Sequence, residues 1–537
     1  MQQVIEAIER IYQRAHDNVK AIVTEGERIS AKKLNANQLS AHAVAYIATE
    51  LEACRQLAGW AERVGGDYEG KVARAYVGEF ARSLLGGVVL GPCENISLAE
   101  LRITEGDLRE TLLQPQVLAF SSENSNGQVY LEIAERARDD GMPNPGFDDE
   151  MLDEIRSQFS KFVDAEVIPQ AQDIHRNDVL IPMEILDQMS ELGVFGLTIP
   201  EEYGGLGMSK VAMCVVTEEL SRGYIGVGSL GTRAEIAAEL ILGGGTEEQK
   251  QKWLPEIAAG EVLSTAVFTE PNTGSDLAHL GTRAVKQDDG SYVVNGQKTW
   301  ITHAVRADLM TLLARTDANE PGYRGLSMFL AEKTRRTGED GEEEFVDQGL
   351  TGTEIKVLGY RGMKEYELSF EDFKLPADSL LGGEEGAGFK QLMRTFESAR
   401  IQTAARGVGV AQAALEDAIL YATEREQFGG PIFQFPRVAR KIGRMVCRVQ
   451  AGRQLTYFSA REKDQEKRCD LEAGMAKLLA TRAAWESADA NVQIHGGNGF
   501  AEEYTASRLL VDARVLSIFE GANEIQAHVV ARRLLES

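Results

Sequence analysis

The segment FTEPNTGSD, residues 268–276, stands where the sequence changes from helical to strand periodicity, and the fold can be worked out from it. Before this segment, apolar residues recur at helical spacing from residue 148 to about residue 260. Between residues 264 and 373 apolar and polar residues alternate, broken by Asp-Gly and Asn-Gly pairs that are typical of tight turns. Helical spacing returns after Leu375-Pro376, so the predicted order is helices, a β unit, then helices.

The expected strands of the β unit cover residues 292–294, 309–313, 326–330 and 366–370. Four stretches follow from this pattern and from a Gly- and Pro-rich linker. They are a helical N-terminal extension ending in that linker (1–146), a helical domain (147–263), a β domain (264–376) and a C-terminal helical bundle (377–537). The predicted fold class is mainly α with a central β-barrel or sandwich domain.

Length and charge narrow the possible classes of protein. A chain of 537 residues is long enough for several domains, and its net charge of -26 opposes binding to nucleic acid or anionic membranes. We expect no signal peptide and no membrane insertion, because no continuous apolar stretch reaches the required length. The five cysteines form no metal-like pairs, which favours a reduced, cytoplasmic protein without a metal site.

Three further segments carry residues suited to binding and chemistry: GQKTWIT (296–302), QIHGGNGF (493–500) and IFEGANEIQ (518–526). In the first segment quoted above, Gly274 lets the backbone approach a ligand, and Thr269 and Ser275 offer hydroxyls to its polar groups. Trp300, flanked by hydroxyls, suits a wall on which a ring stacks. Taken alone, this tryptophan fits a core position better than a cofactor contact.

Together these segments resemble the acyl-CoA dehydrogenase family, and the likeness extends from about residue 148 to residue 537. It includes YGG (203–205), FED (370–372) and EREQFG (424–429). The family's C-terminal signature is matched at Gln493, Gly496, Gly497, Gly499, Glu503, Arg508 and Asp512. The resemblance implies an enzyme of that family that carries FAD.

The resemblance also assigns cofactor contacts. Those within one subunit would be Phe268, Thr269, Gly274, Ser275, Trp300 and Thr302. Those reaching the FAD of a neighbouring subunit would be Arg425, Phe428, Gln493 and Gly497, which implies a homo-oligomer, at least a dimer. Phe268, Pro436 and Ala522 depart from the family pattern, so some hydrogen bonds to the flavin must differ.

Glu520 matches the family's catalytic base, which removes the proton beside the thioester. Apolar neighbours such as Ile518 and Phe519 would desolvate this carboxylate and so raise its basicity. Some family members place the base on an earlier helix just before an arginine, but that position here is Ala399. The alternative is that Glu520 only stabilises the N-terminus of a helix.

The extension resembles that of family members acting on a short branched dicarboxylic acyl-CoA, which implies oxidation of (2S)-methylsuccinyl-CoA to mesaconyl-CoA in the ethylmalonyl-CoA pathway. Burying the free carboxylate of this substrate requires a cation or several donors. Arg233, with Thr232 beside it, is the candidate, and a structural ion pair with an acid from another segment is the equal alternative. Further substrate contacts are expected at Ser275, Arg400 and Gly521.

The expected electron acceptor is electron-transferring flavoprotein. An acyl-CoA oxidase shares the same motifs and would release peroxide, and a dehydrogenase for another short or branched acyl-CoA is a further alternative. A flavin-binding adaptor without catalysis is opposed by the intact Glu520. We expect the extension to pack on the C-terminal helices and to leave the protein a dimer.

Overall fold

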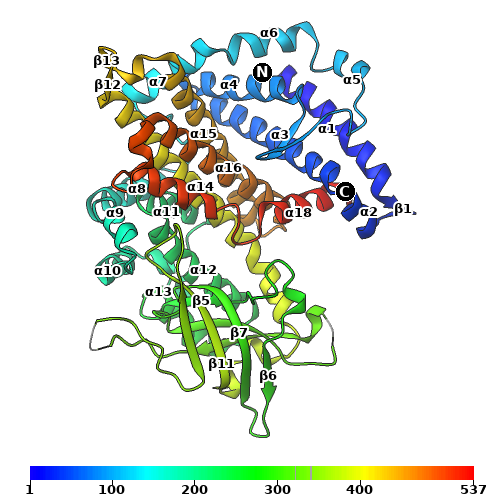
Figure 1. Ribbon diagram of the computed structural model, residues 1–537. Coiled ribbons are helices and arrows are strands. Elements are labelled where there is room, and N and C mark those ends of the chain that lie inside the picture. Colours follow the sequence, from blue (N-terminus) through cyan, green and yellow to red (C-terminus); the bar gives the residue numbers. More distant parts are fainter. Residues whose placement is uncertain (321, 339–340, 537) are drawn as a thin grey trace. The chain divides into compact units, whose positions relative to one another are not determined.

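The computed structural model describes residues 1–320, 322–338 and 341–536 (Figure 1). The chain forms two compact units. Unit 1 joins residues 1–154 to residues 403–537, and unit 2 comprises residues 155–402. The N-terminal extension therefore folds with the end of the chain, as predicted, while the β domain folds with the helices that precede it.

The extension is helical, with two short hairpins. Its elements are α1 (Gln2–Val23), β1 (Thr24–Glu25), β2 (Arg28–Ile29), α2 (Ala31–Ala36), α3 (Gln38–Val64), α4 (Asp67–Leu84), β3 (Val88–Gly91), β4 (Glu94–Ile96), α5 (Glu105–Arg109), α6 (Pro115–Asn124) and α7 (Gly127–Asp139). Helix α1 buries an apolar face at Val4, Ile5, Ile8 and Ile11, in keeping with the predicted helical extension. This burial confirms the helical period found at the start of the chain.

The rest of unit 1 consists of long helices. They are α14 (Gly388–Glu424), which crosses the boundary between the units, α15 (Pro436–Asp464), α16 (Asp470–His495), α17 (Thr505–Val515) and α18 (Asn523–Glu536), with the hairpin β12 (Glu426–Gln427) and β13 (Gly430–Pro431). Helix α3 packs against α15 and α18, and α7 packs against α15 (Figure 1). A Cβ atom at Gly443 of α15 would lie 2.0 Å from the carbonyl oxygen of Tyr130 in α7, so the close approach of these helices requires glycine.

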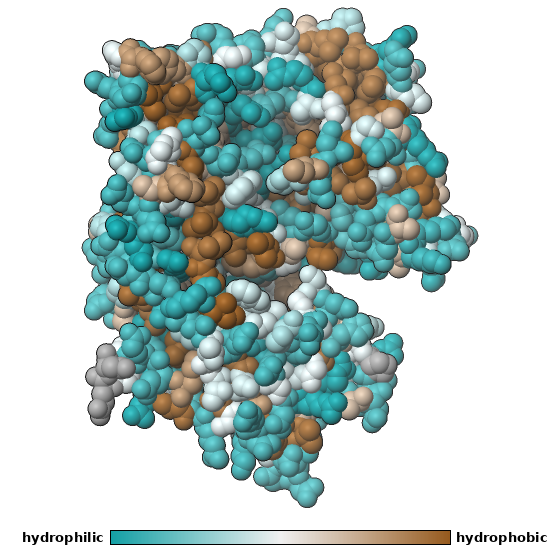
Figure 2. Space-filling model, viewed as in Figure 1, coloured by the Kyte–Doolittle hydropathy of each residue, from teal (hydrophilic) through white to brown (hydrophobic). Residues whose placement is uncertain are grey.

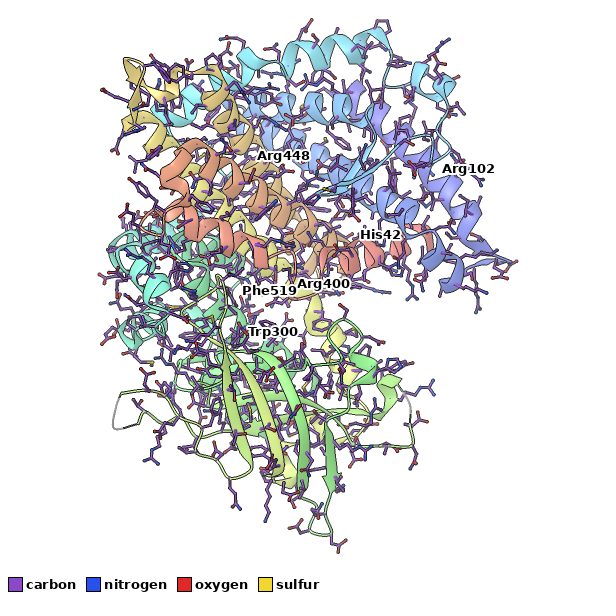
Figure 3. All side chains as sticks on the ribbon, viewed as in Figure 1. His42, Arg102, Trp300, Arg400, Arg448 and Phe519 are labelled. Atoms are coloured by element: carbon purple, nitrogen blue, oxygen red, sulfur yellow. The ribbon has the colours of Figure 1, made fainter. Side chains whose placement is uncertain are left out.

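Ion pairs also fasten the extension to the C-terminal helices. Arg448 of α15 (labelled in Figure 3) lies 3.3 Å from Glu50 of α3, 3.6 Å from Glu79 of α4 and 3.5 Å from Glu486 of α16. Arg444 pairs with the same Glu79. The two arginines therefore join α15 to α3, α4 and α16, and the buried Glu50 and the largely buried Glu79 make this a costly arrangement unless every charge is compensated.

Unit 2 begins with a group of helices, the first of which spans the boundary with unit 1. They are α8 (Glu150–Phe162), the π-helical turn η1 (Val163–Val167), α9 (Ile168–Asn177), α10 (Met183–Glu191), α11 (Lys210–Gly223), α12 (Ile225–Gly244) and α13 (Glu247–Ala258). Helix α12 is buried on almost every side. No helix in the described ranges is both long enough and apolar enough to cross a membrane.

The β domain is one mixed sheet. Its strands are β5 (Ser264–Val267), β6 (Arg283–Lys286), β7 (Tyr292–Thr302), β8 (Leu309–Arg315), β9 (Leu326–Glu332), β10 (Leu350–Ile355) and β11 (Glu365–Leu375). Their order is β10-β11-β7-β6-β8-β5, with β9 also paired to β8. The four expected strands are confirmed as parts of β7, β8, β9 and β11, and a mainly helical fold with a central β domain is confirmed.

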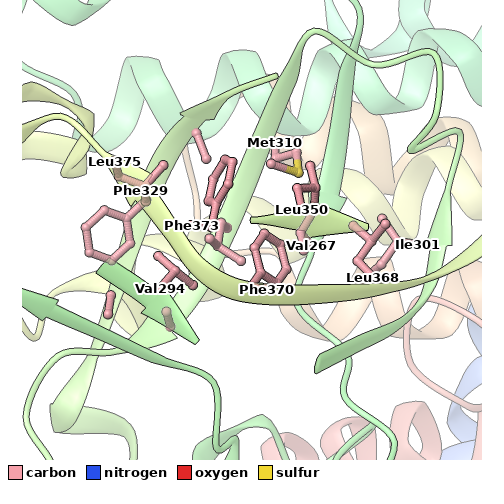
Figure 4. Close-up of a cluster of buried hydrophobic side chains, with 14 of the residues drawn as sticks. Val267, Val294, Ile301, Met310, Phe329, Leu350, Leu368, Phe370, Phe373 and Leu375 are labelled. Carbon is pink, nitrogen blue, oxygen red and sulfur yellow. The ribbon is translucent and has the colours of Figure 1, made fainter. Parts of the chain in front are cut away.

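The core of this domain is apolar and aromatic, with Phe329, Phe370 and Phe373 among its buried side chains (Figure 4). The Asp289-Gly290 pair forms the expected turn between β6 and β7, with Gly290 at φ +88°. The turn expected at Asn295-Gly296 is wrong, because both residues lie inside β7. A Cβ at Gly296 would approach Thr282 Oγ1 to 2.5 Å, so the glycine serves close strand packing instead.

Candidate active site

Trp300 lies on a bulge in β7. Lys298 pairs with Leu368 of β11 and Ile301 pairs with Tyr366, so the register shifts between them. The bulge places Trp300 at φ 58°, and 56% of its surface is exposed (labelled in Figure 3). An exposed indole held on an unusual backbone conformation is suited to stacking on a planar ring. This geometry agrees with the predicted role of Trp300, which stays a prediction.

The segment 268–276 is held against β7 by a buried lysine. Lys298 Nζ donates to the carbonyl oxygen of Phe268 at 2.9 Å and lies 3.0 Å from the Glu270 carboxylate. Thr299 N donates to Thr269 O at 3.0 Å. Burial lowers the pKa of Lys298 to about 8, although the nearby Glu270 opposes this shift. The structure therefore brings Phe268 and Thr269 next to the strand that carries Trp300.

Glu270 and Lys298 were not predicted as site residues, although both lie within the quoted motifs. Glu270 also accepts hydrogen bonds from the backbone of Gly281 at 2.6 Å and Thr282 at 2.9 Å. Burial raises the pKa of Glu270, but Lys298 and these donors outweigh it, so the pKa lies below the ordinary value. The available signal was a lysine inside a predicted strand and a glutamate in the neighbouring motif, since a lysine that becomes buried needs a partner.

The residues of this loop fit FAD. Thr273 Oγ1 is buried and has no hydrogen-bond partner in the described part of the chain, which leaves a donor for a ligand. No atom lies within 4 Å of the place a Cβ would take on Gly274, and Ser275 is exposed. When FAD binds, Trp300 would hold its ring system, and Thr273, Gly274 and Ser275 would meet its polar edge.

Thr302 lies beside a buried acid that none of the sequence motifs indicated. Its Oγ1 donates to the Glu365 carboxylate, with distances of 2.8 and 3.0 Å to the two oxygens. Burial raises the pKa of Glu365 to about 7, against the opposing effects of Thr302 and of the Arg233 charge. Glu365 lies 63 residues from Thr302 along the chain, so no local pattern connects the two.

Arg233 lies on α12, within the domain predicted to be helical, and its side chain is half-buried. Its charge acts on Glu365 and on His303, whose pKa falls to about 3 through burial and through Arg306 and Arg233. The cationic surroundings suit a carboxylate ligand. Glu365 is also the acid from another segment with which Arg233 would form a structural pair, which was the alternative to substrate binding.

The other substrate contacts expected in unit 2 are less informative. The hydroxyl of Thr232 is buried and lies 3.4 Å from the carbonyl oxygen of Gly228 in its own helix. The Arg400 guanidinium stands 5.8 Å from the centre of the Phe396 ring (labelled in Figure 3). Neither contact tests a role in substrate binding.

Glu520 belongs to unit 1, in the tight connection that leads to α18. It has φ 51°, and the following Gly521 has φ 89°. Lys477 of α16 is wholly buried and donates to the carbonyl oxygens of Phe519, at 2.9 Å, and of Gly521. The connection is therefore fastened on both sides of Glu520, which explains how a non-glycine residue is kept at a positive φ.

The Glu520 carboxylate accepts two hydrogen bonds from α14. Thr403 Oγ1 donates to Oε2 at 2.6 Å, and Arg406 Nη2 lies 2.8 Å from Oε1. The side chain of Glu520 is 13% exposed, whereas that of Arg406 is not exposed at all. Arg406 and Thr403 were not predicted, because they lie more than 100 residues before Glu520 in the sequence.

The residues expected to reach a neighbouring subunit's FAD also lie in unit 1. Arg425, Phe428, Gln493 and Gly497 are all exposed, and Phe428 exposes 93% of its surface at φ 54°. Its ring contacts Phe435 edge to face at 5.9 Å. The exposure of these residues agrees with contact to another subunit, which stays a prediction.

Comparison with known proteins identifies the class. The chain matches three family models, the acyl-CoA dehydrogenase N-terminal domain over residues 149–261, the middle domain over 265–373 and the C-terminal domain over 386–535. These matches cover most of the chain, which therefore belongs to the acyl-CoA dehydrogenase family. The predicted family, enzyme class and FAD cofactor are confirmed by this membership.

One relative resembles the whole chain. The (2S)-methylsuccinyl-CoA dehydrogenase of Cereibacter sphaeroides is 53% identical over 534 residues, which is 98% of this chain and 96% of that protein. Among solved structures, butyryl-CoA dehydrogenase from Megasphaera elsdenii matches with a TM-score of 0.67 and 33% identity over 72% of this chain and 98% of its own. A glutaryl-CoA dehydrogenase from Mycobacterium smegmatis in complex with FADH2 matches with a TM-score of 0.65 and 28% identity over 72% of this chain and 95% of its own.

Proposed function

We propose that this protein oxidises (2S)-methylsuccinyl-CoA to mesaconyl-CoA in the ethylmalonyl-CoA pathway. The observation that carries the proposal is the match along the N-terminal extension. The Cereibacter sphaeroides relative matches 98% of this chain, whereas butyryl-CoA dehydrogenase matches 72% of it. Identity at 53% that extends through an additional domain favours a shared substrate over membership of the family alone.

In the proposed reaction, Glu520 removes the proton from the carbon next to the thioester. That proton is weakly acidic, so the base must be ionised, shielded from water and correctly placed. When bound, FAD supplies the acceptor for the hydride that leaves the neighbouring β carbon. Trp300 would orient the flavin, while the Lys298–Glu270 pair keeps the loop at residues 268–276 in place.

Arg233 would receive the free carboxylate of the substrate. Its half-buried position and the cationic surroundings that it shares with Arg306 support this role. Glu365 competes for the same cation, and a protonated Glu365 would compete less, because it carries no charge. The raised pKa of Glu365 therefore agrees with a site prepared for an incoming anion.

Arg233→Ala tests the recognition of the carboxylate. We expect kcat/KM for methylsuccinyl-CoA to fall at least about thirtyfold, because truncating one member of a buried charged pair costs about 2–5 kcal/mol. An uncharged short acyl-CoA serves as the control, and its kcat/KM should change less than about fivefold. Equal losses on both substrates would refute the assignment and would favour a structural pair with Glu365.

Anaerobic bleaching of the bound flavin by a panel of acyl-CoA thioesters tests the function itself. Methylsuccinyl-CoA should bleach the flavin faster than butyryl-, isobutyryl- or glutaryl-CoA, since it alone combines a branch with a carboxylate at the right distance. If another thioester is faster, the substrate assignment is wrong even though the family is shown. Peroxide release in air would separate an oxidase from a dehydrogenase.

Electron-transferring flavoprotein is the proposed acceptor. Support comes from a family relative, the CarC subunit of the caffeyl-CoA reductase–Etf complex of Acetobacterium woodii, which is 35% identical over 71% of this chain and 97% of its own length. Reoxidation of the bleached enzyme by this flavoprotein, without peroxide, is the expected result. No disulfide joins cysteines within the described residues, which agrees with the proposed cytoplasmic location.

We also propose a homodimer. Phe428 and Phe500 expose 93% and 88% of their surfaces, and apolar side chains are visible where the β12–β13 hairpin lies (Figure 2). Large exposed aromatic groups of this kind mark interaction surfaces. The extension covers α15 and α18, which removes the surface for a further pair of subunits. A mass in solution equal to two chains is expected, and four chains would contradict the proposal.

A further inference from the structure

Arg406 forms a closed set of contacts with the proposed base. Its Nη2 lies 2.8 Å from Glu520 Oε1 and donates to Thr403 Oγ1 at 2.8 Å, and that hydroxyl donates to Glu520 Oε2 at 2.6 Å. The guanidinium also stands 4.7 Å from the centre of the Phe519 ring, next in sequence to the base. Both oxygens of the carboxylate are therefore bound by groups of α14.

The location of Arg406 distinguishes it from a substrate contact. Its side chain is wholly buried, whereas the side chain of Glu520 retains 13% exposure. An approaching thioester would therefore reach Glu520 and not the arginine behind it. Figure 3 labels Phe519, the neighbour of Glu520, in this part of unit 1. Arg406 acts on the reaction through the carboxylate that it holds.

The chemistry of the reaction requires such a counter-charge. A base starts its work only in the ionised form, yet a carboxylate that loses water favours the protonated form. The proposed substrate adds a second carboxylate, whose negative charge would favour protonation of Glu520 further. A cation within 4–6 Å opposes both effects, because it typically lowers the pKa of a carboxyl by about one to three units, and an arginine supplies such a cation.

We propose that Arg406 is a positioning residue that keeps Glu520 ionised and turned toward α14 until the substrate arrives. Thr403 supplies the second hydrogen bond of this resting arrangement. Lys477 fixes the backbone on both sides of Glu520, so the carboxylate is placed by three helical side chains, none of which needs to contact the substrate. The proposal rests on Glu520 being the base.

The pH dependence of kcat/KM tests the proposal with the flavin-loaded enzyme. Arg406→Gln should move the acidic limb, below which activity is lost, upward by about one to two pH units, because Glu520 loses its cation. Arg406→Lys should restore at least half of the shift, since it keeps the charge. Thr403→Val should shift the limb less than Arg406→Gln, because it removes only a neutral donor.

Arg453→Gln is the matched control. Arg453 of α15 is also a buried arginine of unit 1, but it binds the amides of Gln450 at 2.7 Å and Gln412 at 2.9 Å. Its loss should leave the acidic limb in place. A uniform drop of kcat/KM in Arg406→Gln with an unmoved limb would overturn the proposal, because that pattern indicates only structural damage. An equal shift in Arg453→Gln would overturn it as well.

Infrared difference spectroscopy of the parent against Glu520→Gln gives a readout that needs no turnover. The stretch of the protonated Glu520 carboxyl should appear at a higher pH in Arg406→Gln than in the parent, by the same shift of about one to two pH units. Its appearance at the same pH in both proteins would contradict the proposal. The kinetic tests use whichever thioester bleaches the flavin, so an error in the substrate assignment would leave these results interpretable.

Discussion

Glu79 of unit 1 and Glu365 of unit 2 are both carboxylates removed from water, but their surroundings differ. Burial alone would raise the pKa of Glu79, yet Arg448 and Arg444 outweigh it and lower that pKa to about 2. Burial raises the pKa of Glu365 to about 7, where a hydroxyl and a more distant arginine oppose it only in part. The surface that fastens the extension is built from compensated charges.

The contrast between Glu79 and Glu365 shows that unit 2 retains a buried acid whose negative charge is only partly compensated. Structural ion pairs hold α3, α4, α15 and α16 together, and each acid there has a cation close by. Glu365 instead lies beside Thr302, a predicted cofactor contact, and within the field of Arg233. Groups with strongly shifted pKa values cluster at functional sites, so this contrast supports the proposed substrate region in unit 2.

The largest effect on stability is expected for Arg448→Met. Removing this cation leaves Glu50, Glu79 and Glu486 with less compensation, and losing one partner of a buried charge typically costs about 3–5 kcal/mol. Hydrogen exchange should show the amides of α3 and α4 opening more easily by that amount, while those of β8 in unit 2 stay protected. Unchanged protection of α3 would show that packing alone holds the extension.

Glu365→Gln should stabilise unit 2 at neutral and alkaline pH, whereas Arg448→Met should destabilise unit 1. A folded pKa of about 7 against an ordinary 4.5 means that the stability contributed by Glu365 is fully present below pH 4.5 and is lost as the pH rises through 7. At pH 8 the cost reaches up to about 3 kcal/mol, and the amide variant avoids it. Exchange at β7 and β11, corrected for intrinsic rates, should lose this pH dependence in the variant. A dependence that survives in Glu365→Gln belongs to another group.

The smallest effect is expected for Arg55→Met in the extension. Arg55 pairs with Glu9 at 2.7 Å and Glu52 at 3.2 Å, but its side chain is 41% exposed. Exposed pairs contribute less than about 1 kcal/mol, so exchange at α3 should hardly change. If Arg55→Met lowered the protection of α3 as much as Arg448→Met does, buried and exposed ion pairs would contribute equally, and the comparison would fail.

Much of the fold and part of the site could be predicted from local sequence. Helical and alternating periods located α1, α3 and the strands β7, β8, β9 and β11, because these patterns repeat within a few residues. The ordered motifs led to Trp300, Glu520 and the family. The Asn295-Gly296 turn was predicted wrongly, because a dipeptide carries no information about Thr282, whose proximity is what requires the glycine.

The partners of the site residues could not be predicted. Arg406 reaches Glu520, Glu365 reaches Thr302, and Arg448 reaches Glu50 only after the chain has folded, across 63 to 398 residues of sequence. The sequence shows that an arginine or a glutamate is present, but its burial and its partner are properties of the tertiary structure. The same holds for Lys298, whose need for Glu270 arises only once β7 is covered.

The central claim is that the Glu520 carboxylate ionises the carbon beside the thioester. The most direct test compares anaerobic flavin bleaching in the parent, in Glu520→Gln and in the control Glu524→Gln, an exposed acid one turn onward. Glu520→Gln should keep its FAD and bleach at least about a thousandfold more slowly, within the range of general bases, whereas Glu524→Gln should match the parent. Bleaching by Glu520→Gln within tenfold of the parent rate would contradict the claim.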